Sequence, residues 1–148
     1  MCYSYKKTCS CGQKSADIFF GNMVLNEAAV ASLYCPNCNG TVDASEKALV
    51  RDNGWVLELD LAFIKEKSPS MGVAPDEISA SWVFDAGYVT WVGITPDDAE
   101  ARDRERAELQ KLAKVDMLAY YEAMKTWGQD RELRFAEEGW RKMAGKRL

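Results

Sequence analysis

Short segments in which apolar and polar residues alternate dominate the first two thirds of the chain. A period of two is typical of half-buried strands, because successive side chains of a strand point to opposite faces of its sheet. We expect the first three of these segments to form a three-stranded ribbon. The alternation and the content of aromatic and β-branched residues predict strands at Tyr3–Thr8, Ala16–Phe20, Val30–Tyr34, Leu57–Phe63 and Tyr88–Ile94.

The segments between the predicted strands carry helix and loop signals. Asp43 or Ser45 can cap a short helix that ends at Asn53-Gly54, where a left-handed stop residue belongs. The stretch Lys65–Ala74 is rich in Ser, Pro and Gly, so it is expected to be a loop. It is also the best candidate for a linker.

Two segments fit both a helix and a strand. The alanine-rich Asn26–Ser32 is compatible with one helical turn before the third strand. In Asp76–Ala86, Pro75 and Gly87 are a good helix start and stop, although the apolar residues also alternate. These end signals favour a helix. The neighbouring aromatic residues are expected to pack in the core rather than to form a recognition surface: Trp82, Phe84, Tyr88 and Trp91.

The last third of the chain changes to the helical period. Thr95 and Pro96 form a helix start. No glycine or proline follows until Gly128, so one helix is expected from Pro96 to Trp127, with a second helix capped by Asp130. The two would pair as a helical hairpin. The apolar stripes are Ala113, Met117, Tyr120, Met124 and Trp127 on the first helix and Leu133, Ala136, Trp140 and Met143 on the second. The seam is expected at Met117, Tyr120 and Met124 against Leu133, Trp140 and Met143.

The composition excludes many common catalytic centres. The chain has 148 residues, 47% of them hydrophobic and 28% charged, as in ordinary globular proteins. It contains no histidine, which removes Ser-His-Asp triads, Cys-His pairs and zinc sites that use imidazole. Glu58 and Asp60 would share one strand face, but a solvated face explains them without catalysis. The expectation leans away from an enzyme, although carboxylates, lysines and tyrosines also transfer protons.

Four of the five cysteines fall into two close pairs. The runs Cys9-Ser10-Cys11 and Cys35-Pro36-Asn37-Cys38 have the spacing of a four-thiolate metal site. A metal-binding turn favours residues that tolerate positive φ, and Gly12 follows the first pair while Asn39-Gly40 follows the second. The predicted metal ligands are Cys9, Cys11, Cys35 and Cys38, and Cys2 is expected to be a spare thiol.

The second cysteine pair resembles the Cys-Pro-x-Cys-Gly knuckle of the zinc-ribbon and rubredoxin families, over about residues 3–42. Two features depart from the commonest pattern: the first pair is Cys-x-Cys, and Asn39 stands where glycine is usual. The resemblance implies a small β domain built around a metal. Closed four-sulfur sites most often hold structural zinc, so Zn²⁺ is expected, with iron as the alternative.

Together these patterns predict an α+β protein in three parts. Residues 1–42 would form a zinc-ribbon-like head, residues 43–94 a small α+β block, and residues 95–148 a helical C-terminal arm. No apolar secretory segment stands at the N-terminus, so a cytoplasmic location is expected. No segment approaches the length of a membrane span.

The net charge of −4 disfavours contact with nucleic acid. The basic residues nearest to a patch are expected to be solvated surface charge: Lys6, Lys7 and Lys14, and Arg141, Lys142, Lys146 and Arg147.

The function that the sequence favours is a non-enzymatic zinc-binding protein-interaction module, a subunit or accessory factor of a larger assembly. Its partner would be another protein, bound through the helical arm, or a second copy of the chain, because methionines and a tryptophan on a long helix offer adaptable apolar contacts. Two alternatives remain open at this point: a nucleic-acid-associated zinc-ribbon protein, and a rubredoxin-like electron carrier with a four-cysteine iron site.

Overall fold

The computed structural model describes residues 3–94 and 96–141. The chain divides into two compact units. Unit 1 is Met1–Gly93 together with Arg141–Leu148, and unit 2 is Ile94–Trp140. The chain therefore leaves unit 1 after Gly93 and re-enters it at Arg141. Cys2, Thr95, Met143 and the basic residues 142, 146 and 147, which the sequence singled out, lie outside the described residues.

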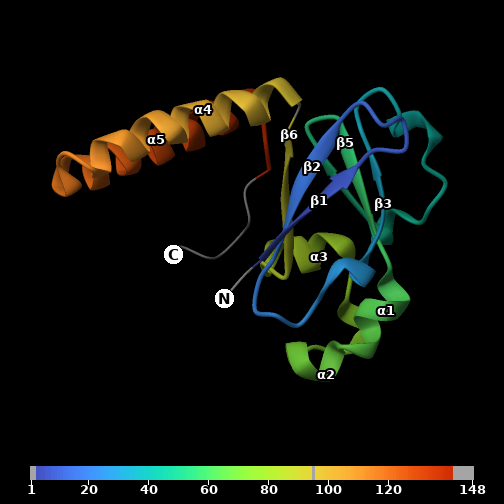
Figure 1. The fold of residues 1–148 in the computed structure, drawn as a ribbon. Coiled ribbons are helices and arrows are strands. Elements are labelled where there is room, and N and C mark those ends of the chain that lie inside the picture. Colours follow the sequence, from blue (N-terminus) through green and yellow to red (C-terminus); the bar gives the residue numbers. More distant parts are fainter. Residues whose placement is uncertain (1–2, 95, 142–148) are drawn as a thin grey trace. The chain divides into compact units, whose positions relative to one another are not determined.

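Unit 1 is built on two three-stranded sheets (Figure 1). Each sheet combines strands from the expected head with strands from the expected middle block. The third strand of the predicted ribbon therefore pairs elsewhere, and the predicted three-stranded ribbon is wrong. The first sheet has the order β1 (Tyr3–Thr8), β2 (Ser15–Phe20), β6 (Val89–Ile94), and the second has β3 (Val30–Tyr34), β5 (Trp55–Leu59), β4 (Leu49–Asp52).

The central strands of the two sheets, β5 and β2, differ in burial. Four of the five residues of β5, the central strand of its sheet, are buried, so both of its faces are covered. It pairs antiparallel with β3 and with β4. On β2, by contrast, Ala16, Ile18 and Phe20 are buried on one face only. Its antiparallel partner on one side is β1, with Tyr5 opposite Ile18.

The aromatic residues in and after the helix predicted at residues 76–86 belong mainly to the core, as expected. Phe84 and Trp91 are buried. Trp91 meets Trp55 edge to face, with the ring centroids 5.9 Å apart. Trp82 stacks on Tyr88 at 5.7 Å, and both rings keep part of their surface in solvent. The two sheets thus share an aromatic contact through Trp55 of β5 and Trp91 of β6.

The helix predicted to end at Asn53-Gly54 is wrong. Ser45 caps only a single 3-10 turn, η3 (Glu46–Ala48), and the chain then enters β4. Asn53 and Gly54 both have positive φ, 49° and 85°, and they form the two-residue turn between β4 and β5. Asn-Gly is the residue pair that such a hairpin turn favours, because both positions are left-handed.

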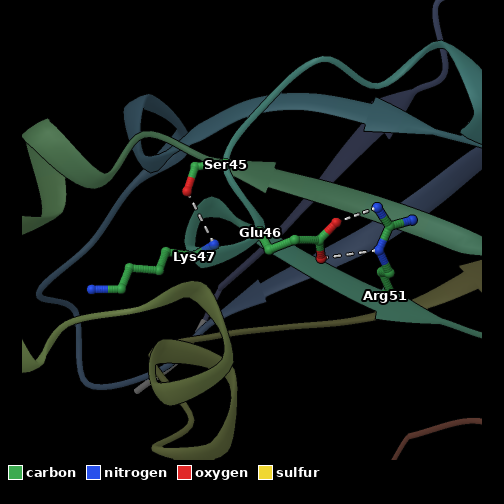
Figure 2. Close-up of polar contacts among 4 residues, drawn as sticks. All are labelled: Ser45, Glu46, Lys47 and Arg51. Carbon is green, nitrogen blue, oxygen red and sulfur yellow. Dashed lines mark hydrogen bonds and ion pairs between the residues drawn. The ribbon is translucent and has the colours of Figure 1, made fainter.

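Figure 2 shows the cap at the start of this hairpin. The Ser45 hydroxyl accepts a hydrogen bond from the Lys47 backbone N–H at 3.4 Å. The Glu46 carboxylate meets the Arg51 guanidinium through two contacts, of 2.7 and 3.3 Å. This solvent-exposed pair links η3 to β4, and it lowers the pKa of Glu46, chiefly by hydrogen bonding.

Three further sequence predictions in unit 1 need correction. The strand expected to reach Phe63 ends at Leu59, because the Asp60 carboxylate accepts from the Phe63 N–H at 3.2 Å and starts a helix. The loop expected at residues 65–74 is largely helical and buries Ser68 and Met71. The helix expected from residue 76 begins at Ala80. The helical elements are α1 (Leu61–Glu66), α2 (Ser68–Met71), η4 (Pro75–Glu77) and α3 (Ala80–Asp85), and η1 (Glu27–Ala29) is the helical turn left open before β3.

Unit 2 consists of two helices, α4 (Pro96–Ala113) and α5 (Met117–Glu138), which lie side by side (Figure 1). The single helix predicted through Trp127 is wrong, because the chain turns at residues 114–116. Asp116 caps α5 by accepting from the Leu118 and Ala119 N–H groups, both at 3.1 Å. Gly128, the predicted stop, lies inside α5, which ends instead at Gly139 with φ of 90°.

Candidate metal centre

The turn between β1 and β2 forms the first cysteine knuckle. The Cys9 N–H donates to the Lys14 carbonyl at 2.9 Å, which closes the hairpin just beyond the paired strands. The Gly12 N–H donates to the Cys9 carbonyl at 2.8 Å, and Gly12 has φ of 74°, as the sequence predicts for a residue after the second thiol. Cys9 is buried, whereas Cys11 is exposed.

The second knuckle follows β3 directly. The Cys38 N–H donates to the Cys35 carbonyl at 2.9 Å, so Pro36 and Asn37 are the central residues of a tight turn. The Thr41 hydroxyl donates to the Cys38 carbonyl at 2.8 Å. The left-handed residue expected after Cys38 is absent from this turn: residues 39–41 form the 3-10 turn η2 (Asn39–Thr41) instead.

The two knuckles bring the four predicted cysteines together. Their sulfur atoms all lie within 4.8 Å of one another. The Cys11 and Cys35 Sγ atoms are 3.7 Å apart. A tetrahedral ion with metal–sulfur bonds of about 2.3 Å separates its sulfur ligands by about 3.8 Å. The donor set and its spacing therefore fit one tetrahedral metal ion.

The hydrogen bonds around the sulfur atoms favour the thiolate form of Cys9. Burial raises the pKa of Cys9. Hydrogen bonds from the Cys11 and Cys35 backbone N–H groups and from neighbouring thiols lower it by more than burial raises it, so the pKa falls to about 6. The Cys35 N–H donates to Cys9 Sγ at 3.3 Å. Hydrogen bonding with Cys35 raises the pKa of Cys38 to about 12, with further contributions from Cys9 and from burial. Four thiols this close do not all ionise without a cation to balance them.

Contacts outside the four cysteines tie the second knuckle to the β4–β5 turn. The Asn39 side chain donates from Nδ2 to the Gly54 carbonyl at 2.9 Å. Pro36 lies beside Gly54, since a Cβ added to Gly54 would lie 3.4 Å from the Pro36 ring. Sequence reasoning missed this link. The signal that could have indicated this link is Asn39, which stands where the zinc-ribbon pattern usually has glycine.

The other residues considered as functional do not form a second site. Glu58 lies on β5, whereas Asp60 caps α1 beyond the end of the strand, so the predicted carboxylate face is wrong. Arg141 is not solvated surface charge: its guanidinium donates to Asp85 at 2.9 Å and lies 4.8 Å from the Phe84 ring centroid. The only group of metal-ligating side chains found within residues 3–94 and 96–141 is the cysteine cluster.

Comparison with known proteins gives no relative. A scan against family models, a search of curated proteins and a search of solved structures each return no match to this chain. Within the part of the chain that the structure describes, no helix combines the length and the apolar character needed to cross a membrane. The functional argument therefore rests on the residues themselves.

Proposed function

We propose that this chain is a non-enzymatic, zinc-binding protein-interaction module, and that it acts as a subunit or accessory factor of a larger assembly. The observation that carries the proposal is the convergence of four cysteine sulfur atoms within 4.8 Å. Zn²⁺ is the ion that most often occupies a tetrahedral site of four sulfur ligands. Cys9, Cys11, Cys35 and Cys38 would hold it.

The role of the metal in this proposal is structural. Four protein ligands complete a tetrahedral shell, so no position remains for a substrate or an activated water. The ion would join the β1–β2 turn to the chain that follows β3. Because these turns belong to different sheets, the metal would link the two sheets of unit 1.

The interaction role is supported by the exposed apolar residues of unit 2. Val115 is 85% exposed, Leu118 73% and Tyr121 63%. They lie at the turn between the helices and at the start of α5, three residues apart along the chain. None of the side chains described at positions 100–140 is buried. Two helices with no buried side chain gain little from their own packing, and exposed apolar residues that cluster mark contact sites.

Metal analysis of the purified protein tests the zinc site. We expect one equivalent of zinc in the wild type and in Cys2→Ser, and a strong loss in Cys38→Ser. A native protein that carries iron and absorbs visible light would replace zinc in the proposal and favour electron transfer. A wild type that binds no divalent ion with affinity above that of Cys38→Ser would refute the site.

A substitution in unit 2 tests the docking role. We expect Leu118→Glu to weaken either self-association, measured by sedimentation, or co-purification of a protein partner, while zinc content stays at one equivalent. Lys125→Glu introduces the same side chain at another exposed position of α5 and is the matched control. Equal association of wild type and Leu118→Glu would show that unit 2 is not the docking element.

A further inference from the structure

We infer that metal binding at the cysteine cluster and the seating of Arg141 in unit 1 are thermodynamically coupled, through the β4–β5 turn. The inference rests on the metal site of the proposed function. It adds a property that a structural zinc site does not require: the ion stabilises the point at which the chain returns from unit 2. Three groups of contacts, all within unit 1, connect the two ends.

The first contact joins the metal knuckle to the hairpin turn. Asn39 follows Cys38 directly, and its side chain donates to the Gly54 carbonyl at 2.9 Å. Pro36, inside the same knuckle, lies beside Gly54. A knuckle fixed by bound metal therefore holds the position of Gly54, whereas a knuckle without metal has no such constraint.

The second contact is the hairpin itself. Asn53 and Gly54 are its two turn residues, and Asp52 pairs with Trp55 across it. A two-residue turn with both φ angles positive allows little independent movement of the residues on either side. Displacement of Gly54 is therefore transmitted to Asp52, the last residue of β4.

The third contact joins Asp52 to the returning chain. Asp52 is 4% exposed, and its Oδ1 accepts from the Arg141 backbone N–H at 2.7 Å. The Arg141 side chain adds a 2.9 Å ion pair with Asp85 and lies over the Phe84 ring. A buried carboxylate that loses its donor is costly, so the position of Asp52 and the seating of Arg141 depend on each other.

Coupling of this kind is reciprocal. If the metal favours the seated state of Arg141, then a seated Arg141 must favour metal binding by the same factor. Coupling between sites typically changes an affinity by roughly 5- to 150-fold. The first step of the path depends on one exposed hydrogen bond, so we expect a factor near the lower end, about 5- to 10-fold.

Zinc affinity, measured by competition with a chromophoric chelator, provides the first test. We expect Arg141→Ala to weaken zinc binding about 5- to 10-fold, because it removes the Asp85 and Phe84 contacts that hold the Arg141 backbone N–H against Asp52. Asn39→Ala should weaken zinc binding to a similar extent. In the double variant the effect of Arg141→Ala should disappear, because Asn39→Ala has already broken the path. Thr41→Val is the matched control, since Thr41 bonds to the same knuckle but not to the hairpin.

Hydrogen exchange at single amides provides the second test, with zinc bound. In Asn39→Ala the Arg141 amide should exchange several times faster than in the wild type. The Tyr88 amide, which donates to the Val83 carbonyl, should keep its protection and thereby show that unit 1 remains folded. The Gly139 amide in unit 2 should also be unchanged.

The outcomes separate this inference from the proposed function. Unchanged zinc affinity in Arg141→Ala, together with unchanged Arg141 exchange in Asn39→Ala, would overturn the coupling while the zinc site stands. Additive effects in the double variant would also overturn it, because they would mean two independent losses. A wild type that binds no zinc would refute the proposed function itself.

Discussion

Trp127 of α5 donates its indole Nε1–H to the Glu105 carboxylate of α4 at 2.8 Å. The same ring is covered on one face by the Arg131 guanidinium, 5.0 Å from the ring centroid. This pair is a polar link between two helices with no buried side chain described at positions 100–140. Its loss should therefore be visible in the stability of unit 2.

We predict that Glu105→Ala destabilises the α4–α5 pair by about 1 kcal/mol, the usual net contribution of a hydrogen bond within a protein. The measurement is thermal melting followed by the helical circular dichroism signal. Glu108→Ala, which removes an exposed contact with Lys111 within α4, is the control and should change stability by less than about 0.5 kcal/mol. Equal effects of the two substitutions would contradict the prediction.

Two glycines should respond to alanine with opposite signs. A Cβ at Gly21 would overlap with the Gly87 carbonyl oxygen, which is a backbone atom and cannot rotate away. Gly21→Ala should therefore destabilise unit 1 by about 1–3 kcal/mol. Gly128 lies inside α5 with open space around it, so Gly128→Ala should stabilise that helix by about 1 kcal/mol. Urea unfolding of the two variants beside the wild type measures both. Stabilisation by Gly21→Ala would show that the Gly21–Gly87 approach is not close in solution.

The stability of unit 1 should depend on pH through Asp52. Burial raises the pKa of Asp52, an effect opposed by the Arg141 N–H and charge. A carboxyl group whose pKa is higher in the folded state contributes stability that is fully present below its unfolded pKa of about 3.9 and is lost as pH rises through the folded pKa. Asp52→Asn keeps an oxygen that accepts from Arg141 but does not ionise, so it should lack this loss.

The test is urea unfolding at several pH values between 4 and 7, at constant zinc concentration. Relative to Asp52→Asn, the wild type should become less stable as the pH rises. Asp43→Asn, at an exposed position, is the control and should follow the wild type. A stability difference between wild type and Asp52→Asn that stays constant over this range would contradict the prediction.

Loss of the Asp116 cap at the turn of residues 114–116 should destabilise α5. Asp116 accepts from two N–H groups at the start of α5, so Asp116→Ala should cost about 1 kcal/mol of helix stability. Asp116→Asn preserves the acceptor and should cost much less. Melting curves that do not distinguish the two substitutions would indicate that the cap contributes nothing to the turn.

Local signals predicted the parts of the fold that depend on neighbouring residues. The strand bounds at Tyr3–Thr8 and Val30–Tyr34 match the structure, because alternation and flanking turns determine them. The spacing of the cysteines also predicted that the four would converge, because each pair lies in a tight turn of the kind that four-thiolate metal sites use. The strand Tyr88–Ile94 is likewise present as β6, one residue shorter.

Predictions failed where one signal has two meanings or where distant residues decide. Asn53-Gly54 is equally suited to stop a helix and to turn a hairpin, and only the burial of β5 selects the hairpin. The turn at residues 114–116 has no glycine or proline, so its one marker was the cap residue Asp116. The link from Asn39 to Gly54 and the seat of Arg141 on Asp52 join residues far apart in sequence, for which no periodicity exists.

The strand order of unit 1 also determines when each sheet can be completed during synthesis. All four metal ligands are synthesised by residue 38, whereas β2 must wait for β6, at residues 89–94, to complete its sheet. Pairing between strands so distant in sequence is slow, because a long loop has to close first. An ion bound at this stage would join the two cysteine knuckles before either sheet is complete. Zinc supply during translation would then determine how long the apolar face of β2 stays uncovered.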